Sequence, residues 1–191
     1  MKTKLIEEEF AYDGSQLRSL FAYMGHGVQG DSIVAWIGPC SIPNEHMVDG
    51  EDLLAGATIA GARMVHFIIE KFHTPLIAGV ALQRLFAAIC LDFLQEMDPE
   101  TARNLRRDGD DLYYDSGTGE GKLSISIATV SPVSTLIHFA ANCTNDGTPV
   151  KTAALSELGL DPRKFALEVM SRFERELRGI EEATVKVRWV K

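Results

Sequence analysis

The feature that most constrains the fold is a long apolar segment, residues 76–94, that directly follows Thr74-Pro75. Threonine is a favoured helix N-cap and proline is favoured in the first turn, so the sequence predicts a helix from here to Met97. Three polar side chains interrupt the segment: Gln83, Arg84 and Asp92. An uninterrupted apolar run of about 20 residues is typical of a membrane span. We therefore expect a buried helix of a soluble domain and no membrane partner.

Most of the remaining regular structure has the alternating or β-branched pattern of strands. The expected strands are residues 4–10, 32–38, 64–72, 111–114, 122–129, 132–142 and 184–190. Residues 64–72 could also form a helix, and their alternation only slightly favours a strand. The other expected helices are residues 15–23 with Ser15 as N-cap, a short basic helix after Asp98-Pro99 with Arg103, Arg106 and Arg107, and a helix from Asp161-Pro162 to Arg178. Hairpins outnumber β-α-β units, which favours an α+β fold with a mixed, mainly antiparallel sheet flanked by helices. The length predicts one domain, residues 1–191.

Composition limits the partners. The chain carries a net charge of -8 with a pI near 5.1, whereas nucleic-acid binding rests on clustered lysine and arginine. We therefore expect a small-molecule ligand and no nucleic acid, and a small anion would need only one or two cations. The three cysteines are far apart and the first ten residues are highly charged, so we expect a reducing, cytoplasmic location. Antiparallel sheets leave free edges, and a homodimer is a further expectation.

One stretch of the chain has residues suited to acyl or phosphoryl chemistry. Asp110 and Asp111 precede a loop, Lys122 follows it, and the strand after Lys122 carries the small residues Ser124, Ser126 and Ala128. An ammonium beside small neighbours can neutralise a developing oxyanion or hold a phosphate. A solvated lysine at the base of a hairpin is the alternative interpretation.

This order, followed by His138 and Asn142, resembles the C-terminal half of the catalytic domain of lipoate ligases and octanoyltransferases. The resemblance covers residues 106–178, and it implies that Lys122 sits beside an acyl carbonyl or an adenylate phosphate. Three departures from those families stand out. The Arg-Arg-x-x-Gly-Gly-Gly phosphate segment is missing, His138 is followed by Phe139 instead of glycine, and no Pro-Cys-Gly turn follows Asn142. A covalent acyl-thioester mechanism is therefore not expected.

Nearly the whole chain resembles a prokaryotic family known as domain-of-unknown-function family 366. The segments that carry this resemblance are residues 12–17, 28–32, 47–49, 66–70, 109–112 and 122–124. It implies a core shared with class II aminoacyl-tRNA synthetases and biotin or lipoate ligases. Fold similarity alone supplies no activity.

Other polar clusters allow weaker interpretations. Residues 25–31 are glycine-rich and could present backbone amides to an anion, but a turn is favoured because they precede a strand. His46, Asp49, Glu51 and Asp52 are suitable metal donors without the helical spacing of a known site, so no metal site is predicted. For His66 we expect a hydrogen-bonded, half-buried histidine.

The sequence leaves three hypotheses. In the first, the protein is an adenylate-forming ligase or transferase with ATP and Mg²⁺: Lys122 is catalytic, Asp110 or Asp111 binds ribose or metal, and Gln29 and Asp31 fix a polar group of the substrate. Further substrate-binding candidates are Ser124, His138, Asn142 and Arg18. In the second, the protein is a binding module that kept the pocket and lost the activation chemistry. The third, metal-dependent hydrolysis through His26 and His46, is the weakest.

Overall fold

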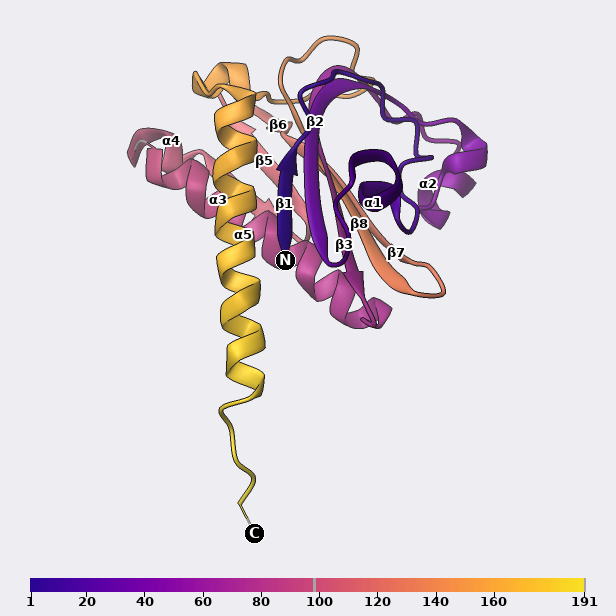
Figure 1. Cartoon of the computed structure of the whole chain (residues 1–191). Helices are drawn as coiled ribbons and strands as arrows, with labels where there is room; N and C mark the ends of the chain where they lie inside the picture. The colour runs from indigo at the N-terminus through magenta and orange to yellow at the C-terminus, as the bar shows by residue number, and fades with distance from the viewer. Residues whose placement is uncertain (98, 191) are drawn as a thin grey trace.

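The computed structural model describes residues 1–97 and 99–190, and its architecture is the predicted α+β fold (Figure 1). The large sheet has the strand order β1 (Lys2–Leu5), β2 (Ser32–Ser41), β3 (Ala60–Phe72), β8 (Ser134–Asn142) and β7 (Ser124–Val130). The small sheet has the order β4 (Leu105–Asp108), β5 (Asp111–Asp115) and β6 (Glu120–Lys122). Only β1 and β2 pair in parallel among these strands. The large sheet is therefore mixed and mainly antiparallel, and the small sheet is antiparallel.

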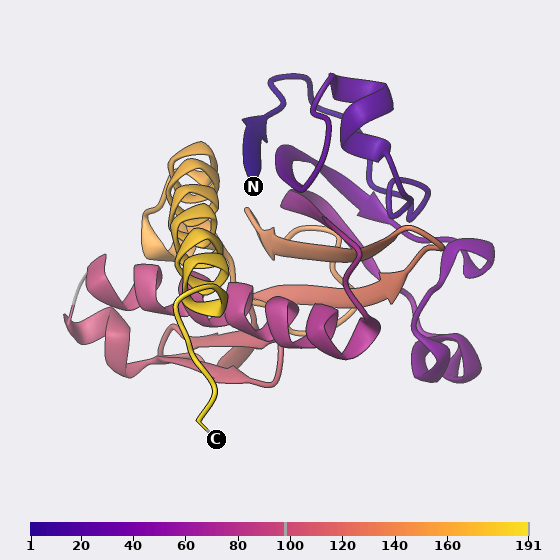
Figure 2. The ribbon, with the colours of Figure 1, turned by 60° about the horizontal axis from the view of Figure 1, so that its bottom comes forward.

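Helices lie on both faces of the large sheet. They are α1 (Phe21–His26), α2 (Gly50–Ala55), α3 (Leu76–Met97), α4 (Pro99–Arg103) and α5 (Pro162–Thr184), with short 3₁₀ turns at Asn44–His46 and Leu155–Leu158. Figures 1 and 2 show α3 and α5 on one face and the segment that carries α1 and α2 on the other. The face that carries α1 and α2 is the one on which the cavity described below opens.

The predicted long helix is confirmed as α3, and it packs in the main core. Phe86 is fully buried, with its ring centroid 5.1 Å from that of Phe67 on β3 and 5.2 Å from that of Phe139 on β8. Truncating such a side chain typically costs about 3–5 kcal/mol. By length and hydropathy alone, α3 could also cross a membrane. A core helix passes the same test, so the absence of a membrane partner stays a prediction.

The predicted hairpin between residues 111–114 and 122–129 is only partly right. β5 pairs with Glu120–Lys122, but β7 belongs to the large sheet and pairs with β8. The chain crosses between the sheets at Leu123, which is fully buried; its N–H donates to Leu112 O at 2.7 Å, and its carbonyl accepts from Asn142 N at 3.0 Å. Burial of Leu123 therefore fixes the point at which one continuous alternating pattern divides between two sheets.

Several element boundaries also differ from the predictions. α1 begins at Phe21 instead of Ser15, because the Ser15 N–H and hydroxyl both bond the Asp13 carboxylate in a tight turn. Arg106 and Arg107 lie in β4, where Arg106 pairs with Glu120 across the small sheet, and not in a basic helix. Asp98, predicted to end the long helix, lies outside the described residues.

The ends of the chain are the other places where the strand predictions fail. The first strand is Lys2–Leu5 and not residues 4–10. Residues 185–190 form no strand in the described part of the chain, and α5 runs on to Thr184. Figure 1 shows this tail leading away from the domain, where no sheet edge is available to it. Alternation alone does not make a strand when the backbone groups have no partner.

Candidate functional site

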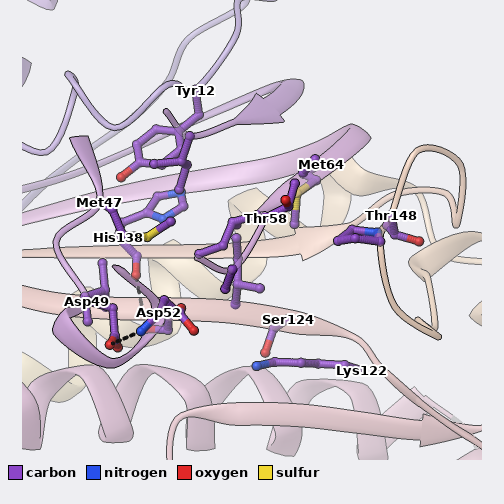
Figure 3. A pocket seen from close by; sticks show the side chains of 18 of the residues that line it. Tyr12, Met47, Asp49, Asp52, Thr58, Met64, Lys122, Ser124, His138 and Thr148 are labelled. Carbon is purple, nitrogen blue, oxygen red and sulfur yellow. Dashed lines mark hydrogen bonds between the residues drawn. The ribbon is translucent and has the colours of Figure 1, made fainter. Parts of the chain in front are cut away.

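A cavity of about 450 Å³ opens at the edge strand β7, between the two sheets and the segment that carries α2 (Figure 3). Its apolar lining includes Leu17, Ile42, Met47, Ile59, Met64 and Ile125. Its charged lining consists of Asp49, Asp52, Asp110, Asp111 and Lys122. The volume is typical of pockets for small molecules. Among the described lining residues, Lys122 is the one lysine or arginine.

Lys122 is positioned by the crossover at Leu123. It ends β6, and its Nζ atom lies 2.7 Å from Asp111 Oδ2 on the neighbouring strand. The Lys122 side chain remains 33% exposed. Figure 3 shows its amine beside Ser124 at the cavity. Burial raises the pKa of Asp111, and the attraction of Lys122 partly opposes that rise. The pair is therefore a charge-assisted contact that a competing anion could enter.

Ser124 and Asn142 support Lys122 through hydrogen bonds within the protein. Ser124 Oγ accepts from Leu112 N at 2.9 Å, and Asn142 Nδ2 donates to Lys122 O and Ala153 O, each at 3.1 Å. Both residues line the cavity, but these polar atoms are already used to join the sheets. Their substrate-binding role stays a prediction, and these bonds make them positioning residues.

The aspartates of the lining are held in two groups. Asp110 accepts from Gln83 Nε2 of α3 at 2.7 Å and lies next to Asp111. Asp49 caps α2 by accepting from the backbone N–H of Glu51 and Asp52. The described residues contain no group of three or more histidine, cysteine and acidic side chains placed to hold a metal ion. Four aspartates therefore share the described lining with the single lysine, and only Asp111 is paired with it.

A stack of aromatic rings forms the wall of the cavity across from Lys122. The Tyr12 ring lies on the His138 ring with centroids 3.7 Å apart and an interplanar angle of 9°. His138 Nε2 lies 3.1 Å from His66 Nδ1, and His66 Nε2 lies 3.2 Å from Gly38 O. His66 is therefore fully buried, not half-buried as predicted. Burial lowers the pKa of His66 to about 4 and holds the pKa of His138 well below its ordinary value.

Three residues predicted to bind substrate do not line this cavity. Asp31 pairs with Lys71 and accepts from Phe72 N at 2.8 Å, so it ties β2 to the end of β3. Arg18 is exposed and lines a separate shallow hollow, and Gln29 is exposed in the turn before β2. The prediction grouped them by their polar character and glycine-rich context. The structure instead turns that segment away from Lys122.

The two histidines of the metal-hydrolysis hypothesis do not lie at the same site. His46 lines the cavity and bonds Asp13 O through Nδ1 at 2.8 Å, whereas His26 stacks on Phe10 and lines the separate hollow. Tyr12 is a cavity residue that the sequence interpretation missed. In the sequence it appears only within residues 12–17, one of the segments that carry the family resemblance, and no local pattern reveals that its ring reaches His138.

The family is established by the match along the whole chain. The family described as Domain of unknown function (DUF366) matches residues 1–188. The chain belongs to the DUF366 family. A protein of unknown function from Pyrococcus horikoshi shares 38% identity with this DUF366 protein and a TM-score of 0.89, over 99% of this chain and 100% of the other. An uncharacterized protein of Methanocaldococcus jannaschii is 29% identical over 188 residues, which span 95% of this chain and 81% of the relative.

More distant solved structures define the fold of this DUF366 protein. A mutant of the biotin protein ligase from Aquifex aeolicus, in complex with biotin, has a TM-score of 0.58 at 14% identity, over 94% of this chain and 72% of the ligase. A putative lipoate protein ligase from T. acidophilum with bound lipoic acid has a TM-score of 0.53 at 14% identity, over 92% and 87% of the two chains. The ligase-like fold predicted from the sequence is confirmed. At this identity the similarity shows the fold alone.

Proposed function

We propose that this DUF366 protein binds a small carboxylic acid in the cavity, with Lys122 contacting the carboxyl group. The observation that carries the proposal is the placement of Lys122, which is the one cation among the described lining residues and stands beside an apolar wall. An ammonium–carboxylate hydrogen bond is about twice as strong as a neutral one. The apolar lining, which includes Met47, Ile59 and Met64, suits the body of such an acid.

Two observations support this ligand class, one from distant relatives and one from the cavity itself. The ligase from Aquifex aeolicus holds biotin and the protein from T. acidophilum holds lipoic acid, and both molecules are carboxylic acids with an apolar chain. A cavity of about 450 Å³ lies within the range of roughly 300–1,000 Å³ that small-molecule pockets occupy.

A thermal-shift screen with octanoate, lipoate and biotin tests the proposal, with the primary amide of each acid as its matched partner. The amide keeps the shape and removes the charge that Lys122 would bind. We expect at least one acid to raise the melting temperature more than its amide does. Stabilisation follows mass action and reaches about 2.7 kcal/mol at ~100 times the dissociation constant. Equal responses to acids and amides would reject the role of Lys122.

Adenylate formation is the second candidate function, and the observation that favours it is the ligase-like fold with Lys122 at the cavity. ATP with Mg²⁺ would be the cofactor. The described lining does not fit a triphosphate well, because four aspartates accompany the single lysine and phosphate groups are held by clustered cations and backbone amides. This mismatch favours binding without activation.

Pyrophosphate exchange separates the two candidates. Purified protein would be incubated with labelled pyrophosphate, ATP, Mg²⁺ and each acid that stabilises it. Binding without activation predicts stabilisation by the acid and no exchange. Acid-dependent exchange would instead make the protein a ligase.

The remaining expectations concern partners and location. A homodimer stays a prediction, and sedimentation analysis of the purified chain would test it. We also propose that the protein acts in the cytoplasm, which fits its three free, buried cysteines; fractionation of cells of the source organism would test this.

A further inference from the structure

The hydrogen-bond chain behind the cavity fixes the protonation of two histidines. A backbone carbonyl only accepts hydrogen bonds, so the contact between His66 Nε2 and Gly38 O requires the His66 proton on Nε2. His66 is fully enclosed and neutral, so its Nδ1 atom is bare and must accept. Its partner there is His138 Nε2 at 3.1 Å. His138 must therefore carry its own proton on Nε2.

The same reasoning leaves the second nitrogen of His138 bare. Burial keeps His138 neutral, and a neutral imidazole has one N–H and one acceptor nitrogen. Its Nδ1 atom is consequently a hydrogen-bond acceptor. Among the residues that the structure describes, nothing donates to it. The Tyr12 hydroxyl, on the ring stacked against His138, likewise has no partner in the described part of the chain.

Neither unpaired atom is fully enclosed by the described residues. In the described residues, Ser32 Oγ is the one fully enclosed side-chain polar atom that lacks a partner. His138 Nδ1 and the Tyr12 hydroxyl are therefore reachable, although the two residues are only 2% and 1% exposed. The space that both residues line is the cavity. Figure 3 shows the two rings together, across the cavity from Lys122.

The position of this pair fits the far end of a ligand held at Lys122. His138 and Asn142 lie on the same face of β8, four residues apart, which corresponds to roughly 13 Å along a strand. Asn142 supports the Lys122 backbone, so it marks the Lys122 end of the cavity.

We infer that the ligand carries, at the end opposite its carboxyl group, an amide- or urea-type group whose N–H donates to His138 Nδ1 and whose carbonyl accepts from the Tyr12 hydroxyl. This inference rests on the proposed function for the carboxyl end of the ligand. It narrows the substrate class, because a plain fatty acid or a dithiolane acid offers no partner to these two atoms. Leaving such groups without partners costs affinity.

The test uses fragments without a carboxyl group, so that it does not depend on Lys122. The probe is 2-imidazolidinone, a cyclic urea with two N–H groups, and its matched control is N,N′-dimethyl-2-imidazolidinone, which keeps the carbonyl and has no donor. Long-range ¹H–¹⁵N correlation spectra of the full chain report which nitrogen of His138 is bare. We expect a bare Nδ1 whose resonance moves with the cyclic urea and not with the dimethyl compound, in the wild type and in Lys122→Met alike.

A second variant keeps the inference falsifiable without disturbing the stack. Tyr12→Phe retains the ring and removes one hydrogen bond, so the cyclic urea should bind roughly fivefold more weakly. A proton on His138 Nδ1, equal responses to the two fragments, or no response to either would overturn the inference. A donor-specific response at His138 together with acid binding that does not depend on Lys122 would reject the proposed function alone.

Discussion

The ammonium of Lys122 lies 2.7 Å from the carboxylate of Asp111, and both side chains line the same cavity. The two residues are held by neighbouring strands of the small sheet, so the pair is fixed before any ligand arrives. An incoming carboxylate must share the ammonium with Asp111 and tolerate its negative charge. Asp111 is therefore both the residue that orients Lys122 and the competitor of the ligand.

Removing the charge of Lys122 should weaken acid binding. Hydrogen bonds to charged groups contribute about 1.5–3 kcal/mol, so Lys122→Met should lower the affinity for an acid by roughly 10- to 100-fold. Isothermal titration calorimetry measures this change. Lys151→Met is the matched control, because Lys151 is an exposed neighbouring lysine whose Nζ bonds Thr118 O. Similar affinities for the two variants would contradict the assignment of Lys122.

Removing the charge of Asp111 should have the opposite effect. Asp111→Asn leaves a group of similar shape and takes away the competing carboxylate, so acids should bind several-fold more tightly. Isothermal titration calorimetry at neutral pH, where the acid is ionised, measures this difference. Weaker binding by Asp111→Asn would mean that orientation of Lys122 outweighs competition.

The buried histidines should make stability depend on pH. Burial lowers the pKa of His66 to about 4 from the 6.5 of an unfolded chain, so between these values the unfolded state binds a proton that the folded state does not. The contribution of His66 to the free energy of unfolding is then fully present above pH 6.5. It is lost as the pH drops toward 4, by about 3 kcal/mol. Urea unfolding of the wild type from pH 7.5 to 4.5 measures this loss.

Two variants isolate the histidine contribution. His66→Gln should reduce the slope between pH 6.5 and 4.5, whereas His73→Asn, at an exposed residue with positive φ, should keep it. The exposed carboxylates Glu96 and Glu120 have pKa values lowered by arginine partners, so their contributions are lost below about pH 4.5. An unchanged slope in His66→Gln would assign the effect to other groups.

Gly121, next to Lys122, should not tolerate a side chain. A Cβ atom there would lie 2.4 Å from Thr152 C and 2.5 Å from Thr152 O, so the backbone beside Lys122 would have to move. Gly121→Ala should lower the free energy of unfolding by about 1–3 kcal/mol or more and weaken acid binding. Gly25→Ala is the control, because nothing lies within 4 Å of that position in α1. Equal stability of the two variants would refute the close approach.

Elements with strong local signals could be predicted from the sequence. Thr74-Pro75 and Asp161-Pro162 mark the starts of α3 and α5, and the Asp161 side chain does accept a hydrogen bond from Lys164 N. The β-branched segment of β2 was predicted as a strand for the same reason, whereas the weaker alternation within β3 only slightly favoured a strand over a helix. Lys122 was selected because small neighbours would let a ligand approach its ammonium and because the resemblance to lipoate ligases implies such a lysine. The structure places it at the cavity.

The rest of the site depends on contacts between distant parts of the chain. The crossover at Leu123 is invisible in sequence, because the alternation of Lys122, Leu123 and Ser124 continues without a break while the pairing partner changes. The stack of Tyr12 on His138 forms only when the N-terminal segment covers the sheet. Asp31 looked like a ligand-binding residue because its partner Lys71 is remote in sequence.

The central claim is that Lys122 binds the carboxyl group of a small acid inside the cavity. A crystal structure of the protein with the acid that stabilises it most tests this claim most directly. We predict a carboxyl oxygen within about 3 Å of Lys122 Nζ and the body of the acid along the apolar wall. An acid bound outside the cavity, or one whose carboxyl group points away from Lys122, would contradict the account.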